Sequence, residues 1–239
     1  MEIKSNITRE AIRTIEMEAE AIRQLTGLLD ESFEEAITCL ADCKGRIVIS
    51  GIGKSAIIAQ KIVATLNSTG SPAIFLHAAD AIHGDLGMVQ QSDVVMIISK
   101  SGESPEIKVL VPLIKNFGNK LIAIVGNTSS FLAKKSDYIL NATVEQEACP
   151  NNLAPTTSTT AQLVMGDAIA VCLMEKRGFD VSDFAKLHPG GTLGKKLYLR
   201  VQDLYTENEK PQVTPEQSLK EVIVEMTKKR LGVTAVVDE

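Results

Sequence analysis

The chain of 239 residues has no tryptophan, few other aromatic residues and no excess of positive charge. Its net charge is -5 at neutral pH, whereas proteins that bind the phosphate backbone of nucleic acids usually carry basic patches. No run of about 18 apolar residues occurs, and the N-terminal residues follow an amphipathic helix pattern that is unlike a signal peptide. These absences argue against nucleic-acid and membrane partners, and we expect a cytoplasmic protein.

The four cysteines include no Cys-x-x-Cys pair, which is the spacing of many zinc and redox sites. Cys39 and Cys43 lie one helical turn apart on a stretch with helical periodicity, and the other two cysteines are isolated. We therefore expect the cysteines to be small apolar side chains in a reducing compartment, without a functional role.

The middle of the chain alternates short apolar runs with helical stretches, after a helical region at residues 6–43 that breaks at Gly27. The runs are rich in Ile and Val on both faces, which is typical of parallel strands covered by helices. The sequence therefore predicts a doubly wound, flavodoxin-like α/β domain: a parallel five-stranded sheet with helices on both faces. The expected strands are residues 46–50, 72–77, 93–99, 120–126 and 137–142, and the expected helices are residues 54–67, 104–117, 129–135 and 157–176.

The composition changes near the C-terminus. We expect a first domain at residues 1–199 and, at residues 200–239, a linker followed by an incomplete β-α-β fragment. A fragment this short buries too little apolar surface to fold alone, so it predicts the opening of a second domain whose remainder is missing. Its expected elements are strands at residues 211–213 and 233–237 and a helix from Pro215 to about Lys229.

The segment SGIGKSA, residues 50–56, has the spacing of a dinucleotide-binding fingerprint between a strand and a helix. The acidic residue that usually ends the next strand is absent, because that strand ends in leucine and histidine. The remaining pattern is a glycine turn at a helix N-terminus, with Lys54 and Ser55, and it suits a small anion such as a phosphate. A tight turn with a solvated lysine is the simpler alternative.

The segment VVMIISKSGESPE, residues 94–106, passes from an apolar run directly into hydroxyl groups around a glycine. Ligands of doubly wound sheets bind beyond the carboxyl ends of strands, where Ser99, Ser101 and Ser104 are expected to converge on one phosphate. Lys100 is the only cation of the segment, which favours a phosphate monoester held by neutral donors. Helix capping by Ser104 is an alternative that does not require the other serines.

A phosphate anchor beside carboxylates and histidines suits proton transfer next to the carbonyl group of a sugar phosphate. Aldose–ketose isomerisation through an enediol is the simplest reaction of this class, and Lys54 can stabilise the developing enediolate. Glu106 and Glu147 are both plausible bases, and residues 144–168 form either the floor of a polar pocket or a polar turn. His77 and His83 lie near carboxylates, but no metal-binding spacing connects them.

Five segments together resemble the sugar isomerase domain of bacterial D-arabinose 5-phosphate isomerases, from about residue 10 onward. The tail, residues 213–239, resembles the first part of the paired CBS regulatory module that follows this domain in the family. The serine loop is common to all sugar isomerase domains, whereas the motifs HGDLGM, EACP-x-x-LAPT-[ST]-STT and HPGG are specific. The segments are SGIGKS, SKSGESPE, HAADAIHGDLGM, EACPNNLAPTTSTTAQLVMGDA and HPGGTLGKKL.

The resemblance implies interconversion of D-ribulose 5-phosphate and D-arabinose 5-phosphate, which feeds synthesis of the Kdo sugar of lipopolysaccharide. It implies a homotetramer with active sites between subunits, and no required cofactor, because the family's zinc is regarded as inhibitory. The family's catalytic positions fall on Lys54, Glu106, Glu147 and His188. Its substrate-contact positions fall on Gly70, Ser71 and His83, and its zinc-contact position falls on His77.

Three other functions remain open at this point. The chain is alternatively an isomerase of another sugar phosphate, or a non-catalytic sensor of sugar phosphates. A sensor that regulates transcription would carry a basic DNA-binding domain, which the sequence lacks. A nicotinamide-dependent enzyme is the third alternative, and it depends on the glycine fingerprint alone.

Overall fold

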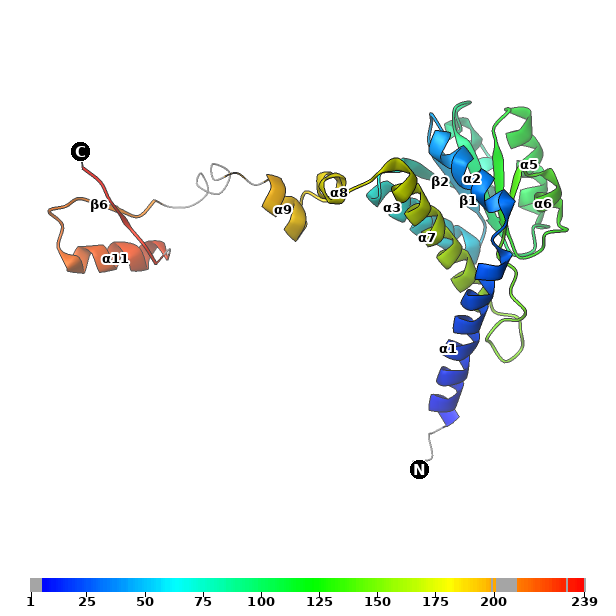
Figure 1. Cartoon of the computed structure of the whole chain (residues 1–239), viewed down its shortest axis with the longest axis horizontal. Helices are drawn as coiled ribbons and strands as arrows, with labels where there is room; N and C mark the ends of the chain where they lie inside the picture. The colour runs from blue at the N-terminus through cyan, green and yellow to red at the C-terminus, as the bar shows by residue number, and fades with distance from the viewer. Residues whose placement is uncertain (1–5, 199, 201–209, 231, 239) are drawn as a thin grey trace. The chain divides into compact units, whose positions relative to one another are not determined.

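The computed structural model describes residues 6–198, 200, 210–230 and 232–238. It divides into two compact units, Met1–Leu187 and His188–Glu239, each of which is described by itself (Figure 1). The domain boundary that the sequence places after residue 199 remains a prediction.

The first unit is built on a parallel five-stranded sheet in the order β2-β1-β3-β4-β5. Each strand begins and ends within one or two residues of its predicted bounds, so the predicted doubly wound fold is confirmed. The order changes direction between β1 and β3, which makes their carboxyl ends the expected ligand position. The strands are β1 (Ile47–Gly51), β2 (Ala73–His77), β3 (Val94–Ser99), β4 (Leu121–Val125) and β5 (Tyr138–Asn141).

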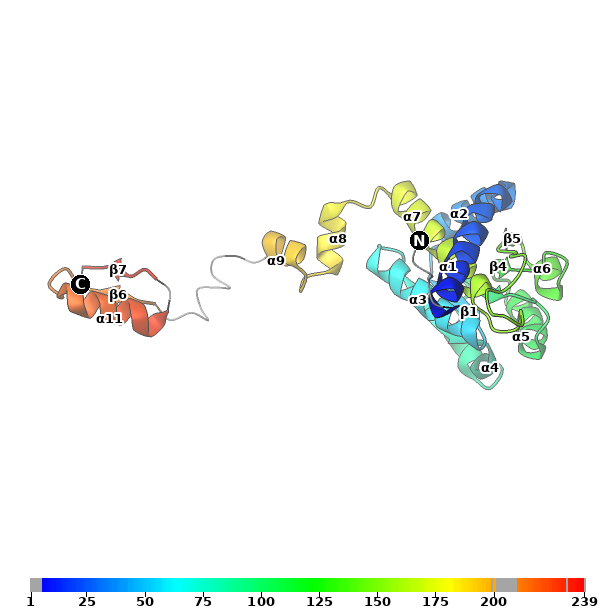
Figure 2. The same ribbon diagram turned by 90° about the horizontal axis from the view of Figure 1, so that it is seen from below.

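Helices cover both faces of this sheet, as Figures 1 and 2 show. One face carries α1 (Asn6–Leu25), α2 (Glu31–Asp42), α3 (Lys54–Ser68) and α7 (Thr157–Arg177). The other face carries α4 (Ala78–Ala81), α5 (Pro105–Asn116) and α6 (Phe131–Lys135). The short helices η1 (Thr26–Leu28), η2 (Asp85–Met88) and α8 (Val181–Leu187) complete the unit.

Alternate residues of each strand point to opposite faces, so the sheet separates two apolar cores. In β1, Ile47 and Ile49 belong to the core beneath α3 and α7, whereas Val48 belongs to the core beneath α4 and α5. The central strands β3 and β4 are buried along their whole length. The strong burial on both faces explains why these strands read as continuous apolar runs in the sequence.

Helix α7 is long and apolar enough to cross a membrane by length and composition, but half of its apolar window is buried inside the protein. Ala161, Met165 and Ile169 belong to the core beneath it, so α7 is a core helix. At Gly166 a Cβ atom would clash with the side chain of Ile62, because α3 and α7 pack closely there. The close packing of α3 and α7 therefore fixes the positions of the residues at their N-termini relative to one another.

The second unit contains α9 (Thr192–Tyr198), β6 (Gln212–Val213), α11 (Leu219–Lys229) and β7 (Ala235–Val236). Strands β6 and β7 pair in parallel on either side of α11, which confirms a β-α-β arrangement. The prediction that the helix starts at Pro215 was wrong. Ser218 and Glu221 form a capping box, which starts the helix at Leu219 instead. The assignment of this unit to a CBS domain remains a prediction, and residues 201–209 of the expected linker lie outside the described residues.

Candidate active site

The glycine turn after β1 brings Lys54 and Ser55 to the N-terminus of α3. Gly53 precedes the helix with a φ of 58°, a conformation that glycine adopts without strain. Lys54 is exposed, and the Ser55 hydroxyl donates to Oε1 of the buried Gln162 on α7 at 3.1 Å. Because β1 and β3 are neighbours, this turn lies beside the loop that follows β3.

The loop after β3, residues 99–104, forms the second wall of the site and is called the serine loop below. The buried Ser99 hydroxyl accepts from the Gly102 amide at 3.0 Å, and Ser101 accepts from the Glu103 amide at 3.3 Å. Ser104 occupies the N-cap position of α5, but its hydroxyl makes no capping bond and is buried without a partner among the described residues. Ser104 thus holds the predicted N-cap position through its backbone, while its hydroxyl is left without a partner among the described residues and suits a bound ligand.

The start of α6 braces the serine loop. The Leu132 amide donates to the Gly102 carbonyl at 3.1 Å, and the Phe131 amide donates to Glu103 at 2.6 Å. Gly102 has a φ of 65°, and a Cβ atom there would clash with the Ser130 side chain. These contacts fix the loop's shape before any ligand binds.

Glu103 is committed to holding this loop. Its carboxylate also pairs with Lys108 at 2.8 Å. The Lys108 ammonium, followed by the Phe131 amide, lowers the pKa of the Glu103 carboxyl. Glu103 therefore serves the shape of the loop and is a poor acceptor for a substrate proton.

Glu147 lies buried at the N-terminus of α7, with 2% of its surface exposed. Its Oε2 accepts from the Thr156 amide at 2.9 Å and from the Ser158 amide at 3.1 Å. Its Oε1 accepts from the Ser158 hydroxyl and, at 2.5 Å, from Lys100 Nζ. Glu147 thus accepts from the amides of Thr156, the N-cap residue of α7, and of Ser158 in the first turn, whereas the Thr156 side chain makes no capping bond to the helix.

These donors determine the charge of Glu147. Burial by itself raises the pKa of this carboxyl, but the bonds from Lys100, Ser158 and Thr156 outweigh it and lower the pKa to about 2. A carboxylate this acidic takes up a proton poorly at neutral pH. Glu106, one residue into α5, is half-buried, and its carboxylate has no hydrogen-bond or ion-pair partner in the described part of the chain. Of the two predicted bases, the structure favours Glu106.

The three histidines are spread over separate segments. His77 ends β2, and its Nδ1 lies 3.4 Å from Asp80 Oδ2. His83 is exposed in the turn after α4. His188 begins the second unit, so its position relative to the serine loop is not described. No group of three His, Cys, Asp or Glu residues within the described ranges is arranged to hold a metal ion.

Gly70 and Ser71 lie just before β2, at the amino edge of the sheet. Arg177, at the end of α7, donates to the Gly70 carbonyl at 3.2 Å and to the Ser71 hydroxyl at 2.9 Å. A cavity of about 310 Å³ adjoins Gly70, lined also by Phe179 and Lys186. Gly70 and Ser71 thus lie at the opposite edge from the serine loop, and their role as substrate contacts remains a prediction.

A family model and several known proteins match this chain. The SIS domain family model matches residues 39–172. The arabinose 5-phosphate isomerase KdsD of Pseudomonas aeruginosa is 50% identical over 96% of this chain and 71% of its own length. The Escherichia coli K12 protein of the same name is 47% identical over 93% of this chain and 68% of its own length. The chain belongs to the family of SIS-domain arabinose 5-phosphate isomerases.

A solved structure of a similar protein holds a sugar phosphate. The protein c3406 of Escherichia coli CFT073, in complex with arabinose 5-phosphate, superposes with a TM-score of 0.75 at 39% identity. The match covers 79% of this chain and all of that one. A Vibrio vulnificus NanR protein at 15% identity, with a TM-score of 0.63, shares the fold alone.

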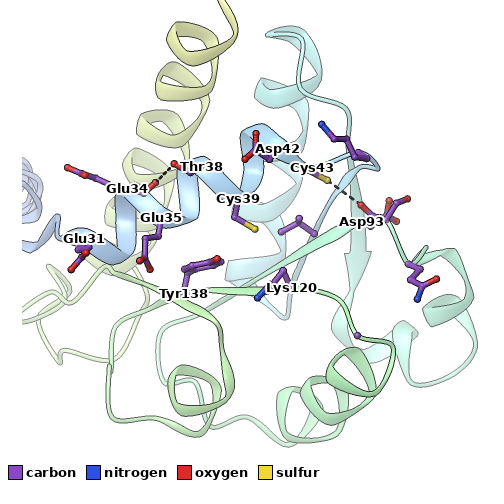
Figure 3. Close-up of a pocket in the computed structure, with 15 residues that line it drawn as sticks. Glu31, Glu34, Glu35, Thr38, Cys39, Asp42, Cys43, Asp93, Lys120 and Tyr138 are labelled. Atoms are coloured by element: carbon purple, nitrogen blue, oxygen red, sulfur yellow. Dashed lines mark hydrogen bonds between the residues drawn. The ribbon is translucent and has the colours of Figure 1, made fainter.

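A hollow of about 780 Å³ lies away from the serine loop of this SIS domain (Figure 3). It is lined by Glu34, Glu35 and Asp42 of α2 together with Lys120 and Tyr138, at the amino edge of the sheet. None of the predicted site residues lines it. Lys54, the serine loop and Glu106 lie instead beyond the carboxyl ends of β1 and β3.

Sequence reasoning missed the partners of Glu147. Lys100 was recognised as a cation of the serine loop, but not as the ion-pair partner of a residue far along the chain. Ser158 and Gln162 lie within the EACPNNLAPTTSTTAQLVMGDA motif, but the motif did not indicate that Ser158 bonds Glu147 or that Gln162 bonds Ser55. The available signal was the run of hydroxyl residues at the start of α7, residues 156–160. Such residues cluster where a helix N-terminus needs hydrogen-bond acceptors or binds a ligand.

Proposed function

We propose that this protein interconverts D-ribulose 5-phosphate and D-arabinose 5-phosphate. The observation that carries the proposal is the position of Glu106, which has no hydrogen-bond or ion-pair partner in the described part of the chain, directly after the serine loop and its unpaired Ser104 hydroxyl. The relatives at 45–50% identity that are named arabinose 5-phosphate isomerases support the choice of sugar. The product would feed Kdo synthesis for lipopolysaccharide in the cytoplasm.

The phosphate monoester binds at the serine loop, between the N-termini of α3 and α5. Glu106 removes the proton from C1 of the ketose and returns it to C2, through an enediolate whose oxygen Lys54 stabilises. A second proton leaves the C1 hydroxyl and reaches the C2 oxygen, and His188 is the proposed acid for this transfer. Ionised Glu147 supports the site without taking the carbon-bound proton.

Proton NMR in deuterated water tests the reaction directly. We expect the protein to convert D-ribulose 5-phosphate into arabinose 5-phosphate that carries deuterium at C2, because the proton on Glu106 exchanges with solvent. Conversion of another ketose phosphate at a higher kcat/KM would assign a different substrate. Ligand line broadening without conversion would favour a non-catalytic sensor of sugar phosphates.

Zinc is not part of the proposed mechanism. His77 and Asp80 offer two donors, whereas protein zinc sites usually have three or four protein ligands, so one chain's described residues do not fit a zinc site. In the same NMR experiment we therefore expect a chelator to leave the rate unchanged or to increase it. A chelator-dependent loss that added zinc restores would contradict this expectation.

The active site is proposed to be shared between the subunits of a homotetramer. Gly70 and Ser71 lie at the amino edge of the sheet, so the substrate contact proposed for them requires the site of a neighbouring subunit. Mixing equal amounts of Lys54→Ala and His188→Ala subunits should restore activity to about a quarter of the wild-type value, if each site combines these residues from two chains. Absence of recovery in hybrids verified by native mass spectrometry would place Lys54 and His188 in the same chain's site.

A further inference from the structure

Lys100 lies in the middle of the serine loop and reaches Glu147 in a different segment. Its carbonyl accepts from the Gly126 amide at 3.0 Å, which fixes the base of the residue to the end of β4. Its ammonium lies 2.5 Å from Glu147 Oε1, which fixes the tip. Ordering an exposed lysine side chain costs rotamer entropy, so surface lysines are seldom fixed in this way.

The ammonium of Lys100 has unused donors. An ammonium group carries three N–H donors, and Glu147 is the only acceptor for them among the described residues. The side chain of Lys100 is 46% exposed, whereas that of Glu147 is fully buried, so molecules from solvent reach Lys100 but not Glu147. A second acceptor therefore has access to Lys100 without displacing Glu147.

We propose that Lys100 is a phosphate-binding residue that Glu147 holds in place at the mouth of the serine loop. This inference rests on the proposed function. Without Lys100 the loop offers only hydroxyls and amides, whereas a phosphate monoester carries roughly 1.5 to 2 negative charges at neutral pH. Glu147 orients the cation and is itself kept ionised, so the pair binds the anion as one unit.

Calorimetric titration with inorganic phosphate tests the proposal without relying on turnover. Lys100→Met should raise the Kd for phosphate roughly 10- to 100-fold, which is the usual range for losing a hydrogen bond between charged groups. Lys100→Arg should retain most of the affinity. The matched control is Lys115→Met, which removes the same charge from an ion pair with Asp137 at the amino edge of the sheet. This control should bind phosphate as the wild type does.

A double variant separates binding by Lys100 from the damage of an unpaired carboxylate. Lys100→Met leaves Glu147 buried without its cation, and this alone could distort the site or prevent folding. Lys100→Met with Glu147→Gln removes that charge, and it should still bind phosphate as weakly as Lys100→Met does. Recovery of wild-type affinity in the double variant would overturn the proposal, as would unchanged affinity in Lys100→Met.

Failure of this proposal and failure of the proposed isomerase activity give different results. If the wild type binds phosphate but does not convert D-ribulose 5-phosphate, and Lys100→Met weakens binding, the proposed function is wrong and the assignment of Lys100 remains. If the wild type isomerises the substrate and Lys100→Met leaves both the phosphate Kd and KM unchanged, the function remains and the assignment of Lys100 is wrong.

Discussion

Replacing Glu106 with Gln should lower kcat by roughly 100- to 10,000-fold, the usual contribution of a general base. The variant keeps the size and polarity of the side chain. The Kd for phosphate should therefore stay within about twofold of the wild-type value, and the variant should fold as the wild type does. The physical reason is the environment of the three carboxylates near the serine loop. Glu103 accepts from the Phe131 amide and pairs with Lys108. Glu147 accepts from amides at the start of α7 and pairs with Lys100. Of these three carboxylates, Glu106 is therefore the one available to receive a proton.

Steady-state kinetics and loss of deuterium incorporation at C2 measure this effect together. Glu106→Asp should restore part of the rate, because it keeps the carboxylate at a shorter reach. The matched control is Glu145→Gln, an exposed carboxylate near Glu147, which should retain wild-type kcat. Glu106→Gln retaining deuterium incorporation while Glu147→Gln loses it would reverse the assignment of the base.

Replacing Glu147 with Gln should lower the free energy of unfolding at neutral pH by about 3 kcal/mol. The carboxyl has a pKa of about 2 in the folded protein and 4.5 as its ordinary value, and each pKa unit corresponds to about 1.36 kcal/mol. The variant also leaves the amides of Thr156 and Ser158 without their charged acceptor. For a protein of this size the loss lowers Tm by roughly 6 to 12 °C.

The pH dependence identifies the charge as the cause. The folded protein binds the Glu147 proton less tightly than the unfolded chain does. The contribution of ionised Glu147 to the free energy of unfolding is therefore fully present above about pH 5 and is lost progressively toward pH 2. Glu147→Gln should lack this part of the acid-induced loss. Urea unfolding at several pH values measures it, and Glu175→Gln on the same helix should change stability by less than about 0.5 kcal/mol. Identical acid dependence in wild type and Glu147→Gln would contradict this account.

Local patterns were sufficient to predict the sheet. β3 and β4 are buried on both faces, so their apolar runs are continuous and their ends are marked by the polar residues that follow. The strand-end rule then placed Lys54 and the serine loop at one edge, and the structure places both segments beside the switch between β1 and β3.

Long-range electrostatics could not be predicted from local patterns. The motif around Glu147 suggested a base, but its ionised state depends on Lys100, which lies 47 residues earlier, and on amides that α7 exposes only when folded. The predicted strand at residues 72–77 did place Gly70 and Ser71 at the amino edge of the sheet, but the family resemblance gave them a substrate contact that this edge does not offer within one chain. The register of β2, which pairs Ala73 with Ile47, agrees with that edge. The capping box of Ser218 and Glu221 is a local sequence signal for the start of α11, but Pro215 is an earlier and competing signal, because proline is common at the first helical position.

The brace between Gly102 and Ser130 restricts how this site can diverge. No side chain fits at position 102 while Ser130 occupies its place, and the positive φ of Gly102 penalises any replacement further. The sequences of the serine loop and of the start of α6 are therefore constrained to change together. We expect a laboratory selection for new sugar specificity to recover changes at both positions together or at neither, and a grafted serine loop to work only when residues 130–132 accompany it.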